Sequence, residues 1–285
     1  NLTPVSGVSD AIPSDILSLR KLNKPRFFDP DDMVVGVEAG MSIWTLQKML
    51  GEKNMLLPVN PWYTNSCVGS MAACNDFGPN RMFMGGLRDY IIGIEYINGE
   101  GKIVSAGGKV VKNVSGYDLT RMMLGSQGGL GVITSLNFKV LPNPVEPHGN
   151  FGTFHDEDWL VQVKELLKRR LPLDWIQASS MHDSNWSLGL GYSGNLSKRN
   201  RIESEIINVF GKSMKILADG KSFSEDDLTP GEQRFEGFLE EARFAAGLKE
   251  KCFHVFATLP TEDLLSFPFE AFRKDKFKMV VHPAG

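Results

Sequence analysis

Strand-like and helix-like patterns alternate along the first part of the chain. Val34–Glu38 is an apolar, β-branched run that predicts a strand. Ser42–Leu50 predicts a helix with Ser42 as its cap, because apolar residues follow at helical spacing. Tyr90–Ile97 predicts a second strand, and Asn98–Lys102 is typical of a hairpin turn. We therefore expect Ile103–Ser105 to be the returning strand.

The pattern is interrupted by a cluster of prolines. Before it, Asp118–Leu124 predicts a short helix capped by Asp118, and Gly131–Leu141 alternates like a strand. Three prolines then break the regular pattern: Pro142, Pro144 and Pro147. The sequence therefore predicts a boundary, with one domain over residues 1–144 and a second over residues 145–285.

Helices and strands also alternate beyond the prolines, which predicts an α+β sandwich in the second half. We expect His148 and His155 to flank a loop. The predicted helices cover residues 157–170, 198–210 and 232–248. The predicted strands cover residues 173–179, 186–191, 253–259 and 277–282.

Composition narrows the class of protein. The chain has 285 residues, 42% of them hydrophobic, so it can bury a large core. Its net charge of −3 disfavours a nucleic-acid binder, which normally carries a basic excess. No apolar run approaches the roughly 20 residues that a membrane-spanning helix needs. The three cysteines form no CxxC pair, which suits a reducing compartment and predicts a cytoplasmic protein.

Several common site motifs are absent. The sequence has no GxGxxG, since Thr134 stands where the third glycine would be, and no GxxxxGK[ST] or GxSxG. The five histidines show no zinc-ligand spacing, so no metal ligands are predicted. His254 lies in an apolar run, which favours a hydrogen-bonded core position.

Three uncharged or glycine-rich segments remain as candidate chemistry. Fourteen of the 29 glycines fall between Gly69 and Gly131. The segments are Met55–Asn75, which has no charged residue, Gly107–Leu119, and Gly125–Ile133. Small residues and hydroxyls suit a diphosphate held by backbone N–H groups. A set of glycine-rich hairpins without a ligand is an equally good interpretation.

These segments resemble the FAD-linked oxidases. Pro58–Pro79 is similar to their cofactor turn, alanine-rich stretch and Gly-Pro. Gly108–Arg121 with Leu124–Ile133 resembles, more narrowly, the FAD-binding subunits of glycolate oxidase, as do Arg88-Asp89 and Leu141-Pro142. The resemblance implies an FAD-binding domain of the vanillyl-alcohol-oxidase (PCMH) type, lacking its first strands and pyrophosphate loop. A smaller α+β, ferredoxin-like cap or substrate domain would follow.

The resemblance also implies which residues contact FAD. One group would lie along the pyrophosphate and flavin: Pro61, Trp62, Tyr63, Thr64, Asn65, Ser66, Cys67, Gly69 and Ser70, continued by Cys74, Asn75, Asp76 and Phe77. A second group would hold the adenosine and phosphates: Gln127, Gly128, Gly129, Leu130 and Gly131, with Val132 and Ile133 shielding them from water. Asn1 follows the position of the missing loop, and Gly116 and Tyr117 would lie near the flavin, although core packing explains Tyr117 equally well.

The sequence departs from the family at several positions. Ser70 replaces the second glycine of the usual turn, and Gly129 stands where many relatives have threonine. The metal motif near the C-terminus of self-sufficient hydroxy-acid oxidases is absent from His282–Gly285. No catalytic residue is assigned, since His182, Arg170 and Arg201 are available residue types with surface roles more typical of them.

The function implied by the resemblance is that of an FAD-binding subunit of a glycolate- or lactate-type dehydrogenase complex. Such a subunit would oxidise a small 2-hydroxy acid or relay electrons through FAD. Its expected partners are a second flavin subunit and an iron–sulfur subunit, which could hold it at the inner face of a membrane. The alternatives are a scaffold subunit that has lost flavin and a binding module based on Trp159, Trp175 and Trp186.

Overall fold

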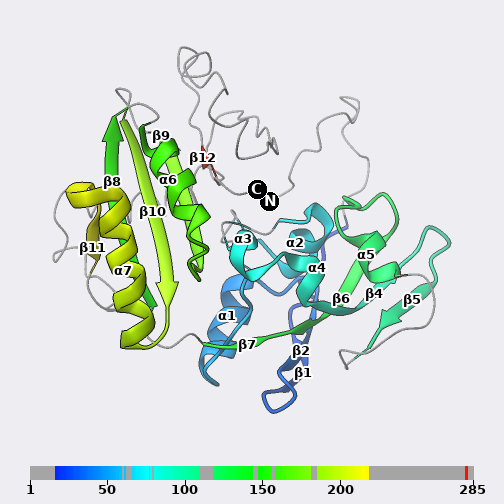
Figure 1. Cartoon of the computed structure of the whole chain (residues 1–285). Coiled ribbons are helices and arrows are strands. Elements are labelled where there is room, and N and C mark those ends of the chain that lie inside the picture. Colours follow the sequence, from blue (N-terminus) through cyan, green and yellow to red (C-terminus); the bar gives the residue numbers. More distant parts are fainter. Residues whose placement is uncertain are drawn as a thin grey trace, which may run out of the picture. The chain divides into compact units, whose positions relative to one another are not determined.

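The computed structural model divides the chain into two compact units (Figure 1). Unit 1 comprises residues 1–78 and 85–143, and unit 2 comprises residues 79–84 and 144–285. The structure describes residues 17–59, 61, 66–76, 78, 80–108, 118–143, 147–155, 158–180, 185–217 and 280–281. That the first domain binds FAD and that the second is a cap or substrate domain stays a prediction.

Unit 1 is built on a five-stranded antiparallel sheet with the order β1-β2-β6-β4-β5. Its strands are β1 (Pro25–Asp29), β2 (Val34–Glu38), β4 (Ile91–Ile97), β5 (Ile103–Gly107) and β6 (Val132–Lys139). Its helices are α1 (Ile43–Gly51), α2 (Val68–Cys74), α4 (Leu87–Tyr90) and α5 (Leu119–Met123). A separate pair, β3 (Met55–Leu56) and β7 (Leu141–Pro142), joins the end of α1 to the chain after β6.

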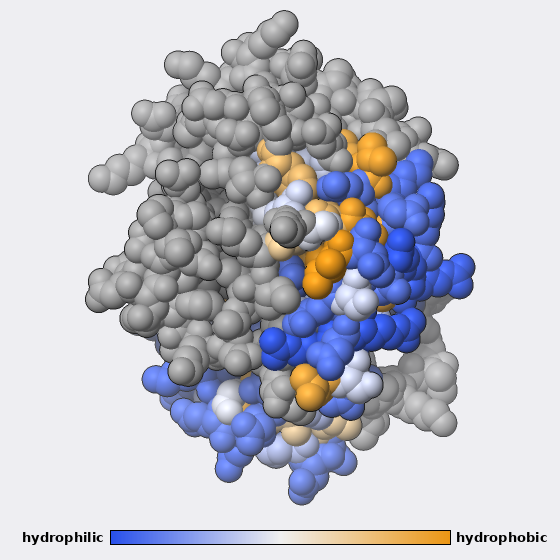
Figure 2. Space-filling model, turned by 60° about the vertical axis from the view of Figure 1, so that its left-hand side comes forward, coloured by the Kyte–Doolittle hydropathy of each residue, from blue (hydrophilic) through white to orange (hydrophobic). Residues whose placement is uncertain are grey.

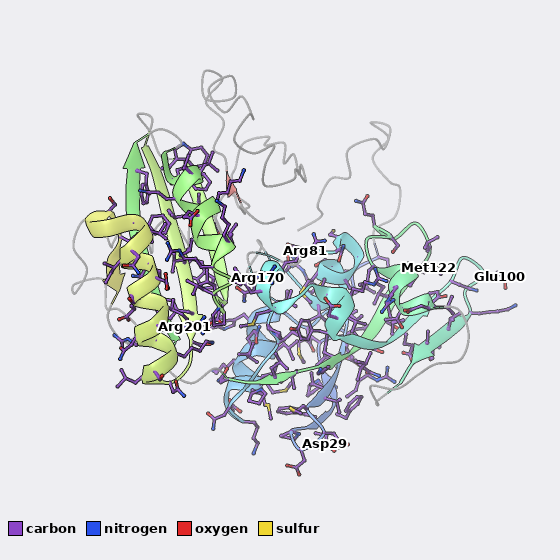
Figure 3. The ribbon with its side chains drawn as sticks, viewed as in Figure 1. Asp29, Arg81, Glu100, Met122, Arg170 and Arg201 are labelled. Carbon is purple, nitrogen blue, oxygen red and sulfur yellow. The ribbon has the colours of Figure 1, made fainter. Side chains whose placement is uncertain are left out.

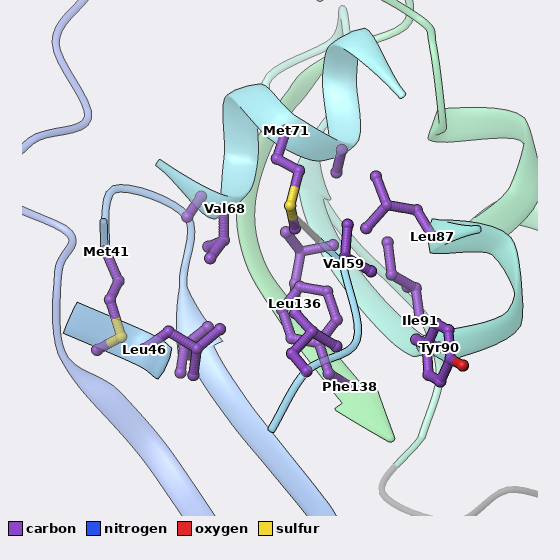
Figure 4. Close-up of a cluster of buried hydrophobic side chains, with 14 of the residues drawn as sticks. Met41, Leu46, Val59, Val68, Met71, Leu87, Tyr90, Ile91, Leu136 and Phe138 are labelled. Atoms are coloured by element: carbon purple, nitrogen blue, oxygen red, sulfur yellow. The ribbon is translucent and has the colours of Figure 1, made fainter. Parts of the chain in front are cut away.

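Alternate residues of this sheet are buried against the helices. Leu136 and Phe138 of β6 are fully buried and share one core cluster with Leu46 of α1 and Met71 of α2 (Figure 4). The residues that alternate with them along β6, such as Ser135 and Asn137, are polar and lie on the other face. The period of two that predicted β6 therefore separates an apolar face from a polar one.

Local capping explains why these elements begin where they do. Ser42 Oγ accepts a hydrogen bond from the backbone N–H of Thr45 at 3.0 Å, at the start of α1. Asp118 Oδ1 accepts one from the N–H of Arg121 at 3.0 Å, at the start of α5. Asn98 Oδ1 accepts the N–H of Lys102 at 2.9 Å and closes the β4–β5 hairpin. The predicted caps and hairpin are thus confirmed.

Unit 2 has the ferredoxin-like order of elements that the resemblance implied. Its strands are β8 (Pro147–His155), β9 (Trp175–Ser180), β10 (Asn185–Ser193), β11 (Lys215–Leu217) and β12 (Val280–Val281). Its helices are α3 (Arg81–Met84), α6 (Asp158–Lys168) and α7 (Leu196–Phe210), and a 3₁₀ turn covers Gly211–Ser213. The sheet order is β11-β8-β10-β9-β12, with every neighbouring pair antiparallel. The run β8-α6-β9-β10-α7-β11 is the βαββαβ arrangement of ferredoxin-like folds.

One face of the unit 2 sheet forms a second hydrophobic core with α6 and α7. Trp159 and Trp186 are fully buried, with ring centroids 5.3 Å apart. They share a cluster with Ile202, Ile206 and Phe210 of α7. These two tryptophans are core residues, so the binding module based on them loses its support. The described surface in Figure 2 is largely hydrophilic with smaller hydrophobic areas, as expected for amphipathic helices.

The structure corrects some predicted elements. His148 and His155 do not flank a loop: both lie in β8, which pairs with β10 along its whole length. The strand predicted over residues 131–141 ends at Lys139, and the next residues cross to β3. The helix predicted over residues 232–248 and the strand over 253–259 lie outside the described residues. Of the strand predicted over 277–282, Val280 and Val281 are described as β12.

Candidate cofactor-binding site

The helix α2 lies at the centre of the first predicted cofactor segment. Its start is closed by the loop after β2, because the N–H of Val68 donates to the carbonyl of Met41 at 2.9 Å and that of Gly69 to Ala39 at 2.8 Å. A Cβ on Gly69 would lie 2.8 Å from Ala39 Cβ. The glycine is therefore required for close packing inside unit 1, and these two N–H groups have protein acceptors.

Ser70 and Cys67 also form a hydrogen bond with each other within the first turn of α2. The Ser70 hydroxyl donates to the carbonyl of Cys67 at 2.9 Å, and Cys67 Sγ lies 3.3 Å from Ser70 Oγ. The hydroxyl that was expected to face the cofactor thus has a backbone acceptor. Ser66 is half-buried and uses its carbonyl to accept the N–H of Ile43 at 3.0 Å. Pro61 is buried.

The end of α2 has a different character. Asn75 adopts a left-handed conformation (φ 51°), and the N–H of Asp76 donates back to the carbonyl of Met71 at 2.9 Å. Cys74 is exposed, but desolvation of its sulfur raises the pKa of the thiol, and the charge of Asp76 and the neighbouring Cys67 raise it further. A protonated thiol is a poor nucleophile, so the raised pKa lowers the reactivity of Cys74 near neutral pH.

The turn over residues 125–131, the centre of the second predicted segment, is docked on this end of α2. The N–H of Gly125 donates to the carbonyl of Ala72 at 3.0 Å, and the N–H of Gln127 donates to Ala73 at 2.9 Å. A Cβ on Gly125 would lie 3.6 Å from Asn75 Cβ. Two segments more than 50 residues apart in the chain are thereby joined into one surface, and no sequence pattern predicted this pairing.

The glycines of this turn have different surroundings. Gly128 has φ +83° and no atom within 4 Å of a Cβ position, while a Cβ on Gly129 would meet the carbonyl oxygen of Ser126 at 3.2 Å. A Cβ on Gly131 would lie 2.5 Å from the carbonyl oxygen of Ile97 in β4. Gly131 is therefore fixed by the sheet, whereas among the described residues a side chain would have open space at Gly128 and one close neighbour at Gly129.

The turn over residues 125–131 carries no charged side chain, and some of its backbone N–H groups have no acceptor among the described residues. Both features fit a phosphate-bearing ligand. The N–H of Gly129 donates to Ser126 at 2.8 Å, but those of Gly128 and Leu130 have no acceptor among the described residues. Gln127 and Leu130 are exposed. Backbone N–H groups beside left-handed residues form anion-binding nests, so this turn fits a nucleotide better than the closed start of α2 does.

The remaining candidates divide into three groups. Ile133 is 4% exposed and belongs to the core of unit 1, and its predicted role in shielding a ligand stays a prediction. Val132 is half-buried and pairs with Ile97. Asn1, Trp62, Tyr63, Thr64, Asn65, Phe77, Gly116 and Tyr117 lie outside the described residues.

No catalytic acid or base emerges from the described residues. Arg170 follows α6 with φ 50°, Arg201 is an exposed residue of α7, and both are labelled in Figure 3. His182 lies outside the described residues. Within the described ranges, no three His, Cys, Asp or Glu side chains gather as a metal site. None of the helices in those ranges is both long and apolar enough to cross a membrane.

Comparisons with known proteins indicate the cofactor. Residues 3–107 match the family model described as FAD binding domain. The chain is 40% identical over 119 residues to glycolate oxidase subunit GlcE of Escherichia coli K12, which covers 41% of this chain and 34% of that protein. It is 32% identical over 130 residues to glycolate oxidase subunit GlcD of Bacillus subtilis, covering 45% and 30%. Residues 3–107 therefore match an FAD-binding domain, and FAD is the indicated cofactor.

A further relative has a different activity, and a solved structure has a similar fold. The chain is 30% identical over 183 residues to D-lactate dehydrogenase of Anaerostipes hadrus, covering 61% of this chain and 38% of that protein. An alkyldihydroxyacetonephosphate synthase structure superposes with a TM-score of 0.61 at 17% identity, covering 80% of this chain and 46% of that one. The second likeness concerns the fold alone. The chain spans about a third of the length of the curated relatives it matches.

Proposed function

We propose that this chain is an FAD-binding subunit of a 2-hydroxy-acid dehydrogenase of the glycolate or lactate type. The observation that carries the proposal is the open turn over residues 125–131 docked on the end of α2, because both parts belong to the segments that resemble FAD-linked oxidases. The identities to glycolate oxidase subunits and to D-lactate dehydrogenase support the substrate class.

The residues of this chain would bind and orient the cofactor rather than transfer protons. When bound, FAD supplies a hydride acceptor for the oxidation of a CH–OH group. The N–H groups of Gly128 and Leu130, which have no acceptor among the described residues, would donate to phosphate oxygens, and the neighbouring glycines let the ligand approach the backbone. The close approach of Gly131 to Ile97 of β4 would keep the turn in place.

Electron transfer and assembly belong to the same proposal. The proposed complex contains an iron–sulfur subunit as the electron acceptor and a second flavin subunit, and these partners would hold the chain at the inner face of a membrane. Because these partners are proposed for the whole complex, the test is whether they co-purify with the chain. The complete gene product is expressed with an affinity tag, and its partners are identified by mass spectrometry and by iron and FAD analysis.

The direct test of the cofactor uses the purified protein. We expect a yellow protein that releases about one FAD per chain on denaturation, and anaerobic bleaching of its visible absorbance by glycolate or D-lactate. Protein that stays colourless after incubation with FAD contradicts the proposal. Flavin that is bound but not reduced by either acid makes the chain a relay, with oxidation in the second flavin subunit.

A scaffold that has lost flavin is the second candidate. It is favoured by one observation: the N–H groups of Val68, Gly69, Gln127 and Gly129 all have acceptors within the chain. Partner binding that persists in colourless protein distinguishes it from the flavoprotein. The two candidates thus differ in a single measurement of bound flavin.

A further inference from the structure

Ser126 lies inside the open turn over residues 125–131, which joins α5 to β6 (Figure 1). The residue is half-buried, but its hydroxyl oxygen is shielded from solvent and has no hydrogen-bond partner among the described residues. Its neighbours in the turn, residue 125 and residues 127–130, are all exposed. A buried hydroxyl without a partner destabilises a folded protein, so we expect this serine to find a partner in another state of the protein.

The backbone of Ser126 is held from both sides. Its N–H donates to the carbonyl of Met123 at 3.3 Å, and its carbonyl accepts the N–H of Gly129 at 2.8 Å. The N–H groups that flank it, those of Gly125 and Gln127, donate to carbonyls at the end of α2. The main chain is therefore fixed at Ser126, and the direction of the hydroxyl is set by rotation about the Cα–Cβ bond, between staggered orientations about 120° apart.

The usual local partner of this hydroxyl is also unpaired. A serine hydroxyl commonly bonds with the backbone N–H two residues further along the chain. Here that group is the N–H of Gly128, and neither it nor the N–H of Leu130 has an acceptor among the described residues. The turn thus combines a hydroxyl and two N–H groups within a short stretch that carries no charged side chain.

A phosphate group matches these donors. It carries several acceptor oxygens and a negative charge, and a hydrogen bond to a charged oxygen is stronger than one between two neutral groups. Backbone N–H groups beside left-handed residues form nests for such anions, and Gln127 and Gly128 have φ values of 52° and 83°. A phosphate oxygen at this nest would supply the acceptor that the hydroxyl of Ser126 does not have among the described residues.

We propose that Ser126 is a further binding residue of the FAD site: its hydroxyl turns out of the buried position and donates to an oxygen of the diphosphate, beside the N–H groups of Gly128 and Leu130. The inference rests on the proposed function and adds to it a side chain that favours a phosphate-bearing ligand. The hydroxyl remains protonated, since it acts as a hydrogen-bond donor. It leaves its unfavourable position when the ligand binds, so it contributes to affinity and not to the stability of the ligand-free protein.

The decisive variant is Ser126→Ala, which removes the hydroxyl and keeps the backbone. In the ligand-free protein, the midpoint of urea denaturation should stay the same or rise, because a buried hydroxyl without a partner is removed. The FAD Kd of the same variant, measured by fluorescence titration, should rise about tenfold, because a hydrogen bond to a charged oxygen is lost. A serine that only supports the fold would instead lower the midpoint and the affinity together.

Ser42→Ala is the matched control, because it removes the same hydroxyl from a residue that has a partner. Ser42 Oγ accepts the N–H of Thr45 at 3.0 Å and caps α1. Its loss should lower the urea midpoint and leave the FAD Kd within about twofold of the wild-type value. The two variants are therefore expected to show opposite patterns of stability and affinity.

The place of the contact can be measured on the ligand by phosphorus NMR. In the complex with FAD, Ser126→Ala should shift a phosphorus resonance relative to the wild-type complex. The visible absorption spectrum of the bound flavin should stay the same, because the hydroxyl is assigned to the diphosphate and not to the flavin ring.

The remaining outcomes count against the inference. It is overturned by an FAD Kd that Ser126→Ala leaves unchanged, and equally by a urea midpoint that falls together with the affinity. A flavin spectrum that changes while the phosphorus resonances do not overturns the assignment to phosphate. Wild-type protein that binds no FAD contradicts the proposed function itself, and the inference then falls with it.

Discussion

The two ends of α2 contact glycine residues in different ways. At its start, Gly69 packs against Ala39 and the first N–H groups bond to the loop after β2. At its end, the turn over residues 125–131 is docked by two backbone hydrogen bonds but keeps Gly128 and Gly129 open. A glycine-rich sequence therefore contains two kinds of glycine, those that allow protein packing and those that leave space. The predictions below separate them.

The largest effect is expected from Gly131→Val. Its Cβ would lie 2.5 Å from the Ile97 carbonyl oxygen, so β4 and β6 would have to move apart. We expect a loss of about 3 kcal/mol in the free energy of unfolding, measured by urea denaturation. A variant as stable as the wild type would show that the pairing at the start of β6 is not needed.

The same substitution at Gly129 should leave the fold intact and remove the cofactor. Among the described residues its Cβ would meet the Ser126 carbonyl oxygen alone, at 3.2 Å, so the side chain would fill the space proposed for the diphosphate. We expect FAD binding to weaken at least about a hundredfold, close to 3 kcal/mol, by fluorescence titration. Gly99→Val is the matched control, because a Cβ on Gly99 has no neighbour within 4 Å. Stoichiometric flavin in Gly129→Val would contradict the location of the site.

A smaller effect is expected at the cap of α5, which precedes the open turn. Asp118→Ala removes the acceptor for the Arg121 N–H and an exposed ion pair with Arg121 at 2.8 Å. The expected loss of unfolding free energy is about 1 kcal/mol, mostly from the cap, since exposed ion pairs contribute little. Asp118→Asn keeps a capping oxygen and should lose only a few tenths of that. Equal losses in the two variants would assign the effect to the charge.

The smallest effect concerns the pH dependence of Cys74. Because desolvation and Asp76 raise the pKa of its thiol, less thiolate is present near neutral pH than for a free cysteine. Its labelling rate should therefore be low at pH 7.5 and continue to rise above the usual titration range. The rate is measured as the difference between wild type and Cys74→Ser. A plateau reached below pH 8.5 would indicate a lowered pKa.

Local rules predicted the local structure well. Ser42, Asn98 and Asp118 cap or close the elements assigned to them, because a side chain and its own neighbours decide such contacts. The family resemblance, confirmed by the comparisons, supplied the cofactor and the ferredoxin-like order of unit 2.

The sequence did not predict which distant residue each glycine or asparagine side chain packs against. Gly69 lies against Ala39, and Asn137 lies between Gly36 and Gly93, only because distant strands meet there. The helix α2 was not predicted either, although Val68–Cys74 contains small helix-compatible residues and ends at a left-handed asparagine. Long-range register decides such contacts, and one sequence does not encode it in any local pattern.

The short helix α3 has a consequence for how the chain can be divided. Phe83 packs against the core of unit 2, although the residues on either side of 79–84 belong to unit 1. A fragment that stops at Asn143 would carry this phenylalanine without its neighbours, as an exposed apolar side chain that invites aggregation. No single cut yields two self-sufficient pieces, so shuffling or truncation at the proline cluster would damage both halves at once.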